Sequence, residues 1–219
     1  MSKAQSLLAG RLIAHGEPVA QGEVATFSGE PATATAISRT DIDGRFSLPV
    51  AGGPATIVAR SLSGRLGLSA TPAAALQPNG DLEVPGPWHD LTIVVHTPPG
   101  DAHPDRLEAW LDPVRPDLPR TFAVQGRGGA RRSHFATVSL SKPTTRLAIQ
   151  AGEWLIGAAF IVSERAMTVQ PSFKNYVAAR AIAGESELEG DAWSGFRLTV
   201  AGSASVDLEL REVADTELL

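Results

Sequence analysis

Cysteine is absent from this 219-residue chain, which excludes disulfides and thiolate metal ligands. Long apolar runs are also absent: the longest, WLIGAAFIV from Trp154, is half of the roughly 18 residues that a membrane helix needs, so we interpret it as a buried strand. The first residues, MSKAQSLLAGRLIAHGEP, lack the hydrophobic region of a secretory signal. We therefore expect no Sec export, no membrane association and a cytoplasmic protein.

An excess of basic residues is missing as well. The formal net charge of -5 argues against a nucleic-acid-binding surface over the whole molecule, because such surfaces carry a basic excess. The hydrophobic fraction of 43% and the charged fraction of 20% are typical of globular chains rather than disordered ones. The length suits two modules of roughly 100 residues each.

Glycine and proline punctuate the chain, and the apolar residues between them alternate with polar ones. In RFSLPV, for example, Phe46, Leu48 and Val50 fall on one face of a strand with a period of two. The same alternation occurs in DLTIVVH, RLEAWLD, FRLTV and SVDLELRE. The pattern predicts an all-β protein built of antiparallel β-sandwiches. The sequence does not decide whether residues 173–184 form a helix or a strand, because they mix residues that favour helix with residues that favour strand.

The stretch TDIDG separates two of these expected strands. Asp41 and Asp43 can accept backbone N–H bonds locally, and Gly44 tolerates a positive φ, so we predict a structural turn. The alternative is that both aspartates bind calcium. Calcium takes six to eight oxygen ligands, and no further carboxylates cluster nearby in the sequence.

Three stretches carry a family resemblance: GRLIAHGEPVAQGEVATF, then ISRTDIDGRFSLPVAGGPATIVARS, then HDLTIVVHTP. Over residues 9–97 the chain resembles the carboxypeptidase regulatory-like domain, a transthyretin-like sandwich with an Ig-like architecture. Members of that family are accessory, adhesive and assembly modules, so the resemblance specifies fold far more than activity. It implies a non-catalytic structural or protein-binding accessory protein, a component of a larger bacterial assembly or a partner of an enzyme.

The second half resembles a divergent second copy. TTRLAIQAGEWLIGAAFIVSE has the same order of strand, small-residue turn and apolar strand as GRFSLPVAGGPATIVARSLSG. HDLTIVVHT and VDLELREVA also match as the terminal strands of the two copies. We therefore expect two tandem Ig-like or transthyretin-like antiparallel sandwiches, residues 1–97 and 98–219, joined by the proline-rich linker 96–105.

Catalysis is not expected. The transthyretin-like hydroxyisourate hydrolases end in Tyr-Arg-Gly-Ser and the intradiol dioxygenases hold iron with two tyrosines and two histidines, whereas this chain ends in ADTELL and has the single tyrosine Tyr176. No Gly-x-Ser-x-Gly elbow occurs. We predict no catalytic residue and no cofactor.

Histidine is concentrated at His89, His96 and His103, with aspartates beside them. A metal site needs such side chains to converge, but His89 and His96 are an odd number of residues apart on a strand and so lie on opposite faces. We therefore expect no metal site and interpret these residues as solvated strand ends and linker.

A protein partner is expected, and five residues are candidates for contacting it. Arg127, Arg131 and Arg132 surround two glycines and can present guanidinium groups to an anionic partner; the alternative is a basic hairpin loop that aids solubility. Trp88 and Trp110 are expected to be partly exposed, as interface aromatics often are; the alternative for Trp110 is a face covered by the neighbouring module. A carbohydrate that stacks on Trp88 or Trp110 is the alternative ligand.

Overall fold

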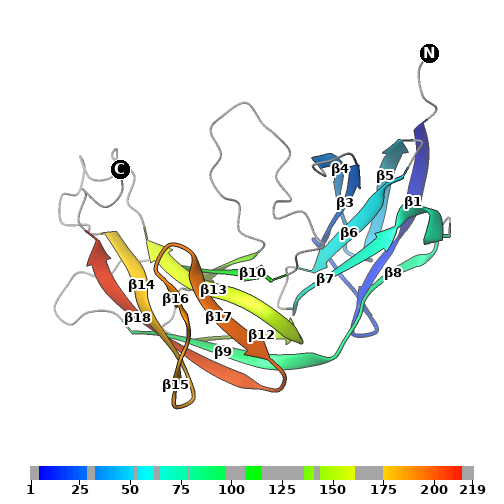
Figure 1. Ribbon diagram of the computed structural model, residues 1–219. Helices are drawn as coiled ribbons and strands as arrows, with labels where there is room; N and C mark the ends of the chain where they lie inside the picture. The colour runs from blue at the N-terminus through cyan, green and yellow to red at the C-terminus, as the bar shows by residue number, and fades with distance from the viewer. Residues whose placement is uncertain are drawn as a thin grey trace. The chain divides into compact units, whose positions relative to one another are not determined.

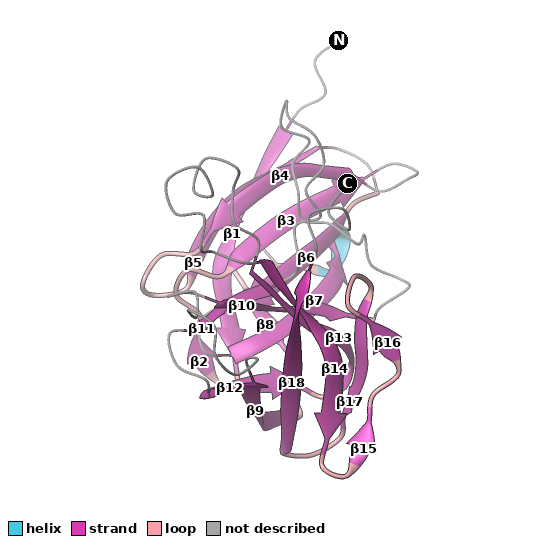
Figure 2. Ribbon diagram, turned by 90° about the vertical axis from the view of Figure 1, so that its left-hand side faces the viewer, coloured by secondary structure: helices cyan, strands magenta, loops and turns pink. Residues whose placement is uncertain are grey.

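The structure is a computed structural model that describes residues 5–28, 33–51, 54–61, 65–77, 79–96, 107–114, 136–140, 144–160 and 175–213. Within these ranges the chain is all-β apart from one short 3-10 helix, η1 (Ala73–Ala75), as Figure 2 shows. The predicted fold class, an all-β protein with several sheets, is confirmed. None of the described residues forms a helix of the length and apolar character required to cross a membrane.

The chain divides into two compact units. The first contains the described residues up to Trp88 together with Ala148–Ala151, and the second begins at His89. The boundary between the two units therefore lies just before the strand HDLTIVVH. The sequence pattern instead makes this strand the last of the first module and puts the boundary between residues 97 and 98. The expected linker, residues 96–105, lies outside the described residues except for His96.

The first unit is a two-layered sandwich. In one layer β1 pairs antiparallel with β2 and β5 and parallel with β8; in the other the order is β4-β3-β6-β7, all antiparallel. The strands are β1 (Gln5–Ala14), β2 (Glu17–Pro18), β3 (Glu23–Ser28), β4 (Thr33–Arg39), β5 (Arg45–Ala51), β6 (Thr56–Ser61), β7 (Arg65–Pro72) and β8 (Asp81–Val84).

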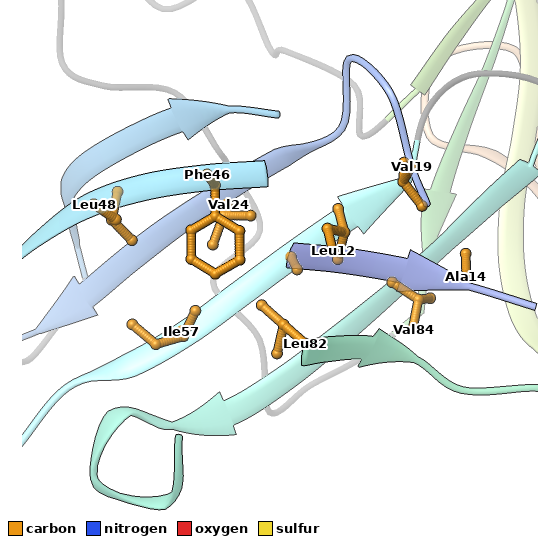
Figure 3. Packing of buried hydrophobic residues seen from close by; sticks show 10 residues of the cluster. Leu12, Ala14, Val19, Val24, Phe46, Leu48, Ile57, Leu82 and Val84 are labelled. Carbon is orange, nitrogen blue, oxygen red and sulfur yellow. The ribbon is translucent and has the colours of Figure 1, made fainter. Parts of the chain in front are cut away.

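The core of this unit lies between its two layers (Figure 3). Leu12 from β1 and Phe46 from β5 face Val24 and Ile57 from the other layer, and Leu82 of β8 closes the cluster. All five side chains are buried, and burying each contributes about 1.5–3 kcal/mol to folding. In β5 the buried Phe46 and Leu48 lie on the face that the alternating pattern of RFSLPV predicts.

The predicted structural turn before β5 is confirmed. Oδ1 of Asp41 accepts bonds from the backbone N–H groups of Asp43 at 2.9 Å and Arg45 at 2.8 Å. Gly44 has a φ of +75°, and a Cβ atom built on it would lie 2.7 Å from the carbonyl oxygen of Leu12. A side chain at this position would therefore meet both backbone strain and a steric clash.

From Trp88 onward the described residues form strands β9 to β18 (Figure 1); β9 begins at the last residue before the second unit, and the end of β12, within Ala148–Ala151, belongs to the first. They are β9 (Trp88–His96), β10 (Leu107–Pro113), β11 (Ala136–Leu140), β12 (Thr144–Gln150), β13 (Gly152–Phe160), β14 (Asn175–Ala183), β15 (Ser186–Glu187), β16 (Gly190–Asp191), β17 (Gly195–Val200) and β18 (Ala204–Val213). Within the open region 173–184, β14 covers Asn175–Ala183 and Gly184 begins a turn. The apolar run from Trp154 lies in β13 as far as Phe160, and Trp154, Ile156 and Ala158 are buried.

The two units repeat one pairing scheme. Antiparallel pairs β3·β4, β3·β6 and β6·β7 in the first unit correspond to β10·β11, β10·β13 and β13·β14 in the second. The parallel pair of β1 with β8 corresponds to the parallel pair of β9 with β18, and the strands β8 and β18 share the similar sequences DLEV and DLEL. β9 is thus the counterpart of β1. It begins the second unit and does not end the first.

One element of the second unit has no counterpart in the first. Between β7 and β8 the described residues form only η1 and turns, whereas β15, β16 and β17 lie between β14 and β18. We call residues Gly184–Val200, which contain these three strands, the insertion. The shared scheme is complete without it, so the insertion is an addition to the scaffold.

Candidate interaction site

The insertion is held to the second unit at both of its ends. At the first end β15 folds back on β14, pairing Ile182 with Glu187 and Ala183 with Ser186. At the other end β17 pairs antiparallel with β13 over residues 196–200, while β16 pairs only with β17. The connection from β16 to β17 is therefore a hairpin tip carried by a strand of the sheet.

Asp191 shapes this tip. Its Oδ1 accepts the backbone N–H groups of Trp193 and Ser194, both at 2.8 Å. The bond from the Ser194 N–H, then that from Trp193, and then one from the Ser194 side chain lower the pKa of the Asp191 carboxyl, because all of them favour its charged form. An aspartate that bonds to the backbone two and three residues ahead is a local turn former, so the path of the chain at Trp193 is defined.

Trp110 supports the base of the same hairpin. It stands directly opposite Gly157 in the β10·β13 pair, and its ring occupies the space where side chains on Gly157 and Gly195 would stand. Gly195 also has a φ of +87°, which favours glycine. The indole of Trp110 therefore lies across two glycines of neighbouring strands.

This arrangement corrects the expectation that Trp110 is partly exposed. Trp110 is only 6% exposed, because glycines on β13 and β17 leave room for its ring. Alternation along β10 identifies the face on which Trp110 lies, but a strand's sequence does not reveal what covers that face. Trp110 is a support for the insertion and not a surface aromatic.

Trp193 is the exposed aromatic side chain of the insertion. Its exposure of 45% contrasts with 6% for Trp110 and 2% for Trp154. The apolar anchoring of the hairpin is supplied by Phe196, which is buried beside the sheet. The turn is thus formed by Asp191, Gly195 and Phe196, and the indole of Trp193 lies largely outside the core.

The insertion is acidic. Residues 184–200 contain one basic residue, Arg197, and four acidic residues, Glu185, Glu187, Glu189 and Asp191. Glu187 is paired with Arg180 of β14 at 2.9 Å, and Asp191 accepts the turn bonds. The exposed side chains of Glu185 and Glu189 have no hydrogen bond or ion pair within the described part of the chain.

Arg180, which precedes the insertion, and Arg197, which lies within it on β17, are both engaged. Arg180 contacts Glu187 and also Glu209 of β18 at 3.5 Å; the bond to Glu187 is the main reason that the pKa of Arg180 is raised. Arg197 contacts Glu153 across the β13·β17 pair at 3.1 Å. Neither guanidinium contacts Glu185, in the turn between β14 and β15, or Glu189, which precedes β16.

The other residues proposed from the sequence lie elsewhere. Arg127, Arg131 and Arg132 are outside the described residues, so their role in partner binding stays a prediction. Trp88 is half-buried against the first unit's core, and its Cη2 lies 2.5 Å from the position of a Cβ on Gly67. Its Nε1 is buried and has no hydrogen-bond partner among the described residues.

The described histidines do not converge on a shared site. His96 of β9 contacts Asp207 of β18, with 2.7 Å between Nε2 and Oδ1. Among the described residues, no group of three histidine, aspartate or glutamate side chains is arranged to hold a metal ion. His103 lies outside them.

Sequence reasoning missed the insertion and Trp193. A signal was present: GDAWSGFRLTV, like TDIDGRFSLPV, places an aspartate a few residues before a glycine and a phenylalanine. Both aspartates bond to backbone N–H groups in the turn, both glycines have positive φ, and both phenylalanines are buried. Each turn also carries an exposed apolar side chain shortly after its aspartate: Ile42 is 85% exposed and Trp193 is 45% exposed.

Comparisons with known proteins give distant structural likenesses only. No family model matches the chain, and no curated protein matches it. One similar solved structure is the Bacillus anthracis TIE protein, with 9% identity and a TM-score of 0.29, covering 95% of this chain and 34% of that one. A second is the minor pilin GBS52 of Streptococcus agalactiae, with 10% identity and a TM-score of 0.29, covering 95% of this chain and 96% of the pilin. A third is a DUF3823 family protein of Parabacteroides merdae, with 9% identity and a TM-score of 0.29, covering 97% of this chain and all of that protein. The chain thus spans about a third of the TIE protein. These scores carry no argument about function.

Proposed function

We propose that this protein is a non-catalytic accessory protein whose second unit binds another protein through the tip of the insertion. One observation carries the proposal: an exposed tryptophan stands on a defined turn of an element that the repeated scaffold does not need. Tryptophan is among the residues that most often dominate binding energy at protein interfaces. Function placed on an addition to a common scaffold is a frequent arrangement in β-sandwich proteins.

The alternative of a carbohydrate ligand has less support. Sugar rings commonly stack on coplanar exposed aromatics, and the described residues provide one exposed aromatic side chain, Trp193. Trp110, one of the two tryptophans expected to stack on a sugar, is buried. We therefore favour a protein partner.

The arginine-rich stretch is a second, independent candidate contact. Replacing Arg127, Arg131 and Arg132 together with alanine is expected to leave stability within about ±0.5 kcal/mol per site. It should weaken partner association and reduce the sensitivity of that association to salt, because exposed charges act through screened attraction. Wild-type affinity in this triple variant would place the interface elsewhere.

Site-specific photocrosslinking tests the proposal. A photoreactive amino acid is placed at position 193, and at Ser203 in the exposed β17–β18 turn as the control. We expect one protein to be crosslinked from position 193 and not from 203, and the purified complex to lose affinity in Trp193→Ala but not in Ile42→Ala. Equal crosslinking at both positions, or full affinity in Trp193→Ala, would contradict the proposal.

A further inference from the structure

We infer that Asn79 is a site of spontaneous covalent modification, at which the side-chain amide is lost and an aspartate or isoaspartate residue forms. The site lies in the first unit, so the inference goes beyond the proposed function, which concerns the second. Three features carry it: the residue that follows Asn79, the exposure and conformation of its turn, and the hydrogen bonds that join this turn to β1.

The first feature is the dipeptide itself. Asparagine occurs twice in the chain, and Asn79 is followed by Gly80 whereas Asn175 is followed by Tyr176. The backbone nitrogen after an asparagine can attack the carbonyl carbon of the asparagine side chain. A side chain on the following residue hinders this attack, and glycine has none. Asn79 is therefore the more reactive of the two asparagines.

The reaction needs only water as a co-reactant. The Gly80 nitrogen loses its proton and bonds to Cγ of Asn79, while the bond from Cγ to Nδ2 breaks and Nδ2 leaves with that proton as ammonia. Water then opens the cyclic imide, giving its hydroxyl to one carbonyl carbon and its other proton to the Gly80 nitrogen. Opening at Cγ gives aspartate, and opening at the main-chain carbonyl carbon gives isoaspartate.

The second feature is the turn, whose backbone favours both residues of the dipeptide. Asn79 is exposed and has a φ of +60°, a conformation that asparagine tolerates better than most residues. A Cβ atom built on Gly80 would lie 3.1 Å from the carbonyl oxygen of Gln77. The Gly80 N–H donates to that same oxygen at 3.0 Å, and this bond opens before the nitrogen attacks. Exposed turns open locally at a low free-energy cost.

The third feature is the connection of the turn to β1. The N–H of Asn79 donates to the carbonyl of Ala9 at 2.8 Å, and the N–H of Arg11 donates to the carbonyl of Gly80 at 3.3 Å. The approach is close, since a Cβ on Gly10 would lie 2.5 Å from the Gly80 oxygen. Isoaspartate adds one carbon to the main chain between these two bonds. Both bonds can then no longer keep their geometry, so the modification loosens the turn from β1.

The test ages the purified full chain in a mildly alkaline buffer and follows it by intact mass and peptide mapping. We expect a gain of about 1 Da at position 79 and none at Asn175 over the same period. The gain should be faster at higher pH, because the attacking nitrogen must lose its proton. Asp43, which also precedes a glycine, can isomerise without a change of mass, so peptide mapping distinguishes the two positions.

One variant isolates the site. Asn79→Gly retains the positive φ and removes the side-chain amide, so its peptide should gain no mass. Hydrogen exchange at the amides of residues 79 and 11 should be faster in the aged wild type than in fresh protein. The aged variant should show no such change. Circular dichroism and thermal melts establish that the variant is folded.

Three outcomes overturn the inference. They are an unchanged mass at position 79 in the aged wild type, an equal gain at Asn175, or a gain at the same peptide in Asn79→Gly. Unchanged hydrogen exchange in fully modified protein would overturn the loosening of the turn from β1. Crosslinking from position 193 is expected to be the same in aged and fresh protein, so failure here leaves the proposed function untouched.

Discussion

The ring of Trp110 occupies the space that a side chain on Gly195 would need. Trp110 belongs to β10 of the repeated scaffold and Gly195 to β17 of the insertion, so this contact joins the added element to the common framework. A bulky residue on one strand is matched by the absence of a side chain on another. The pair therefore fixes where the hairpin of β16 and β17 lies on the second unit.

Gly195→Ala should be strongly destabilising. An added methyl group meets the indole of Trp110, and the φ of +87° is unfavourable for any residue with a Cβ atom, so we expect a loss of about 2–4 kcal/mol. Gly202→Ala is the matched control, since nothing lies within 4 Å of a Cβ there. Urea unfolding measures both. Equal stability of the two variants would show that Trp110 does not pack across Gly195.

Gly44→Val should destabilise the first unit by about 1–3 kcal/mol, because a β-branched residue resists a positive φ and its Cβ would meet the carbonyl of Leu12. Asp41→Asn should leave stability nearly unchanged, since an amide oxygen can still accept the bonds from Asp43 and Arg45. Thermal melting with and without calcium checks this. A melting temperature that rises with calcium only in the wild type would contradict a purely structural turn.

A buried ion pair in the first unit leads to the third prediction. Glu23 of β3 is almost fully buried and receives a hydrogen bond from Nε of Arg60 at 2.8 Å; Arg39, which is mostly exposed, contacts its other oxygen at 3.3 Å. Arg60→Ala leaves a buried carboxylate with little compensation and should cost about 3–5 kcal/mol.

Arg39→Ala removes the exposed partner of Glu23 and should cost less than about 1 kcal/mol. Denaturant unfolding of both variants measures the difference between them. If Arg39→Ala proved as costly as Arg60→Ala, burial would not be what makes the Glu23–Arg60 pair important.

The turn at Asp191 should respond to acid. Because the pKa of this carboxyl is lowered in the folded protein, its contribution to stability is present above the ordinary aspartate pKa and is lost as the pH falls through the lowered value. Asp191→Asn keeps an oxygen acceptor but does not titrate. The difference in unfolding free energy between wild type and Asp191→Asn should therefore shrink between neutral pH and about pH 2, while a constant difference would show that the carboxylate's charge is irrelevant.

Local patterns determined much of this fold. Alternating residues such as Phe46, Leu48 and Val50 define a strand and its buried face, because side chains on a strand point to opposite sides in turn. The aspartate and glycine of TDIDG define a turn, because their backbone preferences act within a few residues. These effects require no knowledge of distant neighbours, and they were sufficient to predict an all-β chain.

Tertiary structure alone decided the rest. Alternation does not identify a strand's partner, so the sequence predicts DLTIVVH at the end of the first module, whereas β9 pairs with β18. The mixed propensities of residues 173–184 were settled by the partners β13 and β18. Trp110 is buried because β17 covers its ring, and Trp193 is exposed because the turn between β16 and β17 holds it outside the core. Both outcomes depend on contacts between strands that are far apart in the sequence.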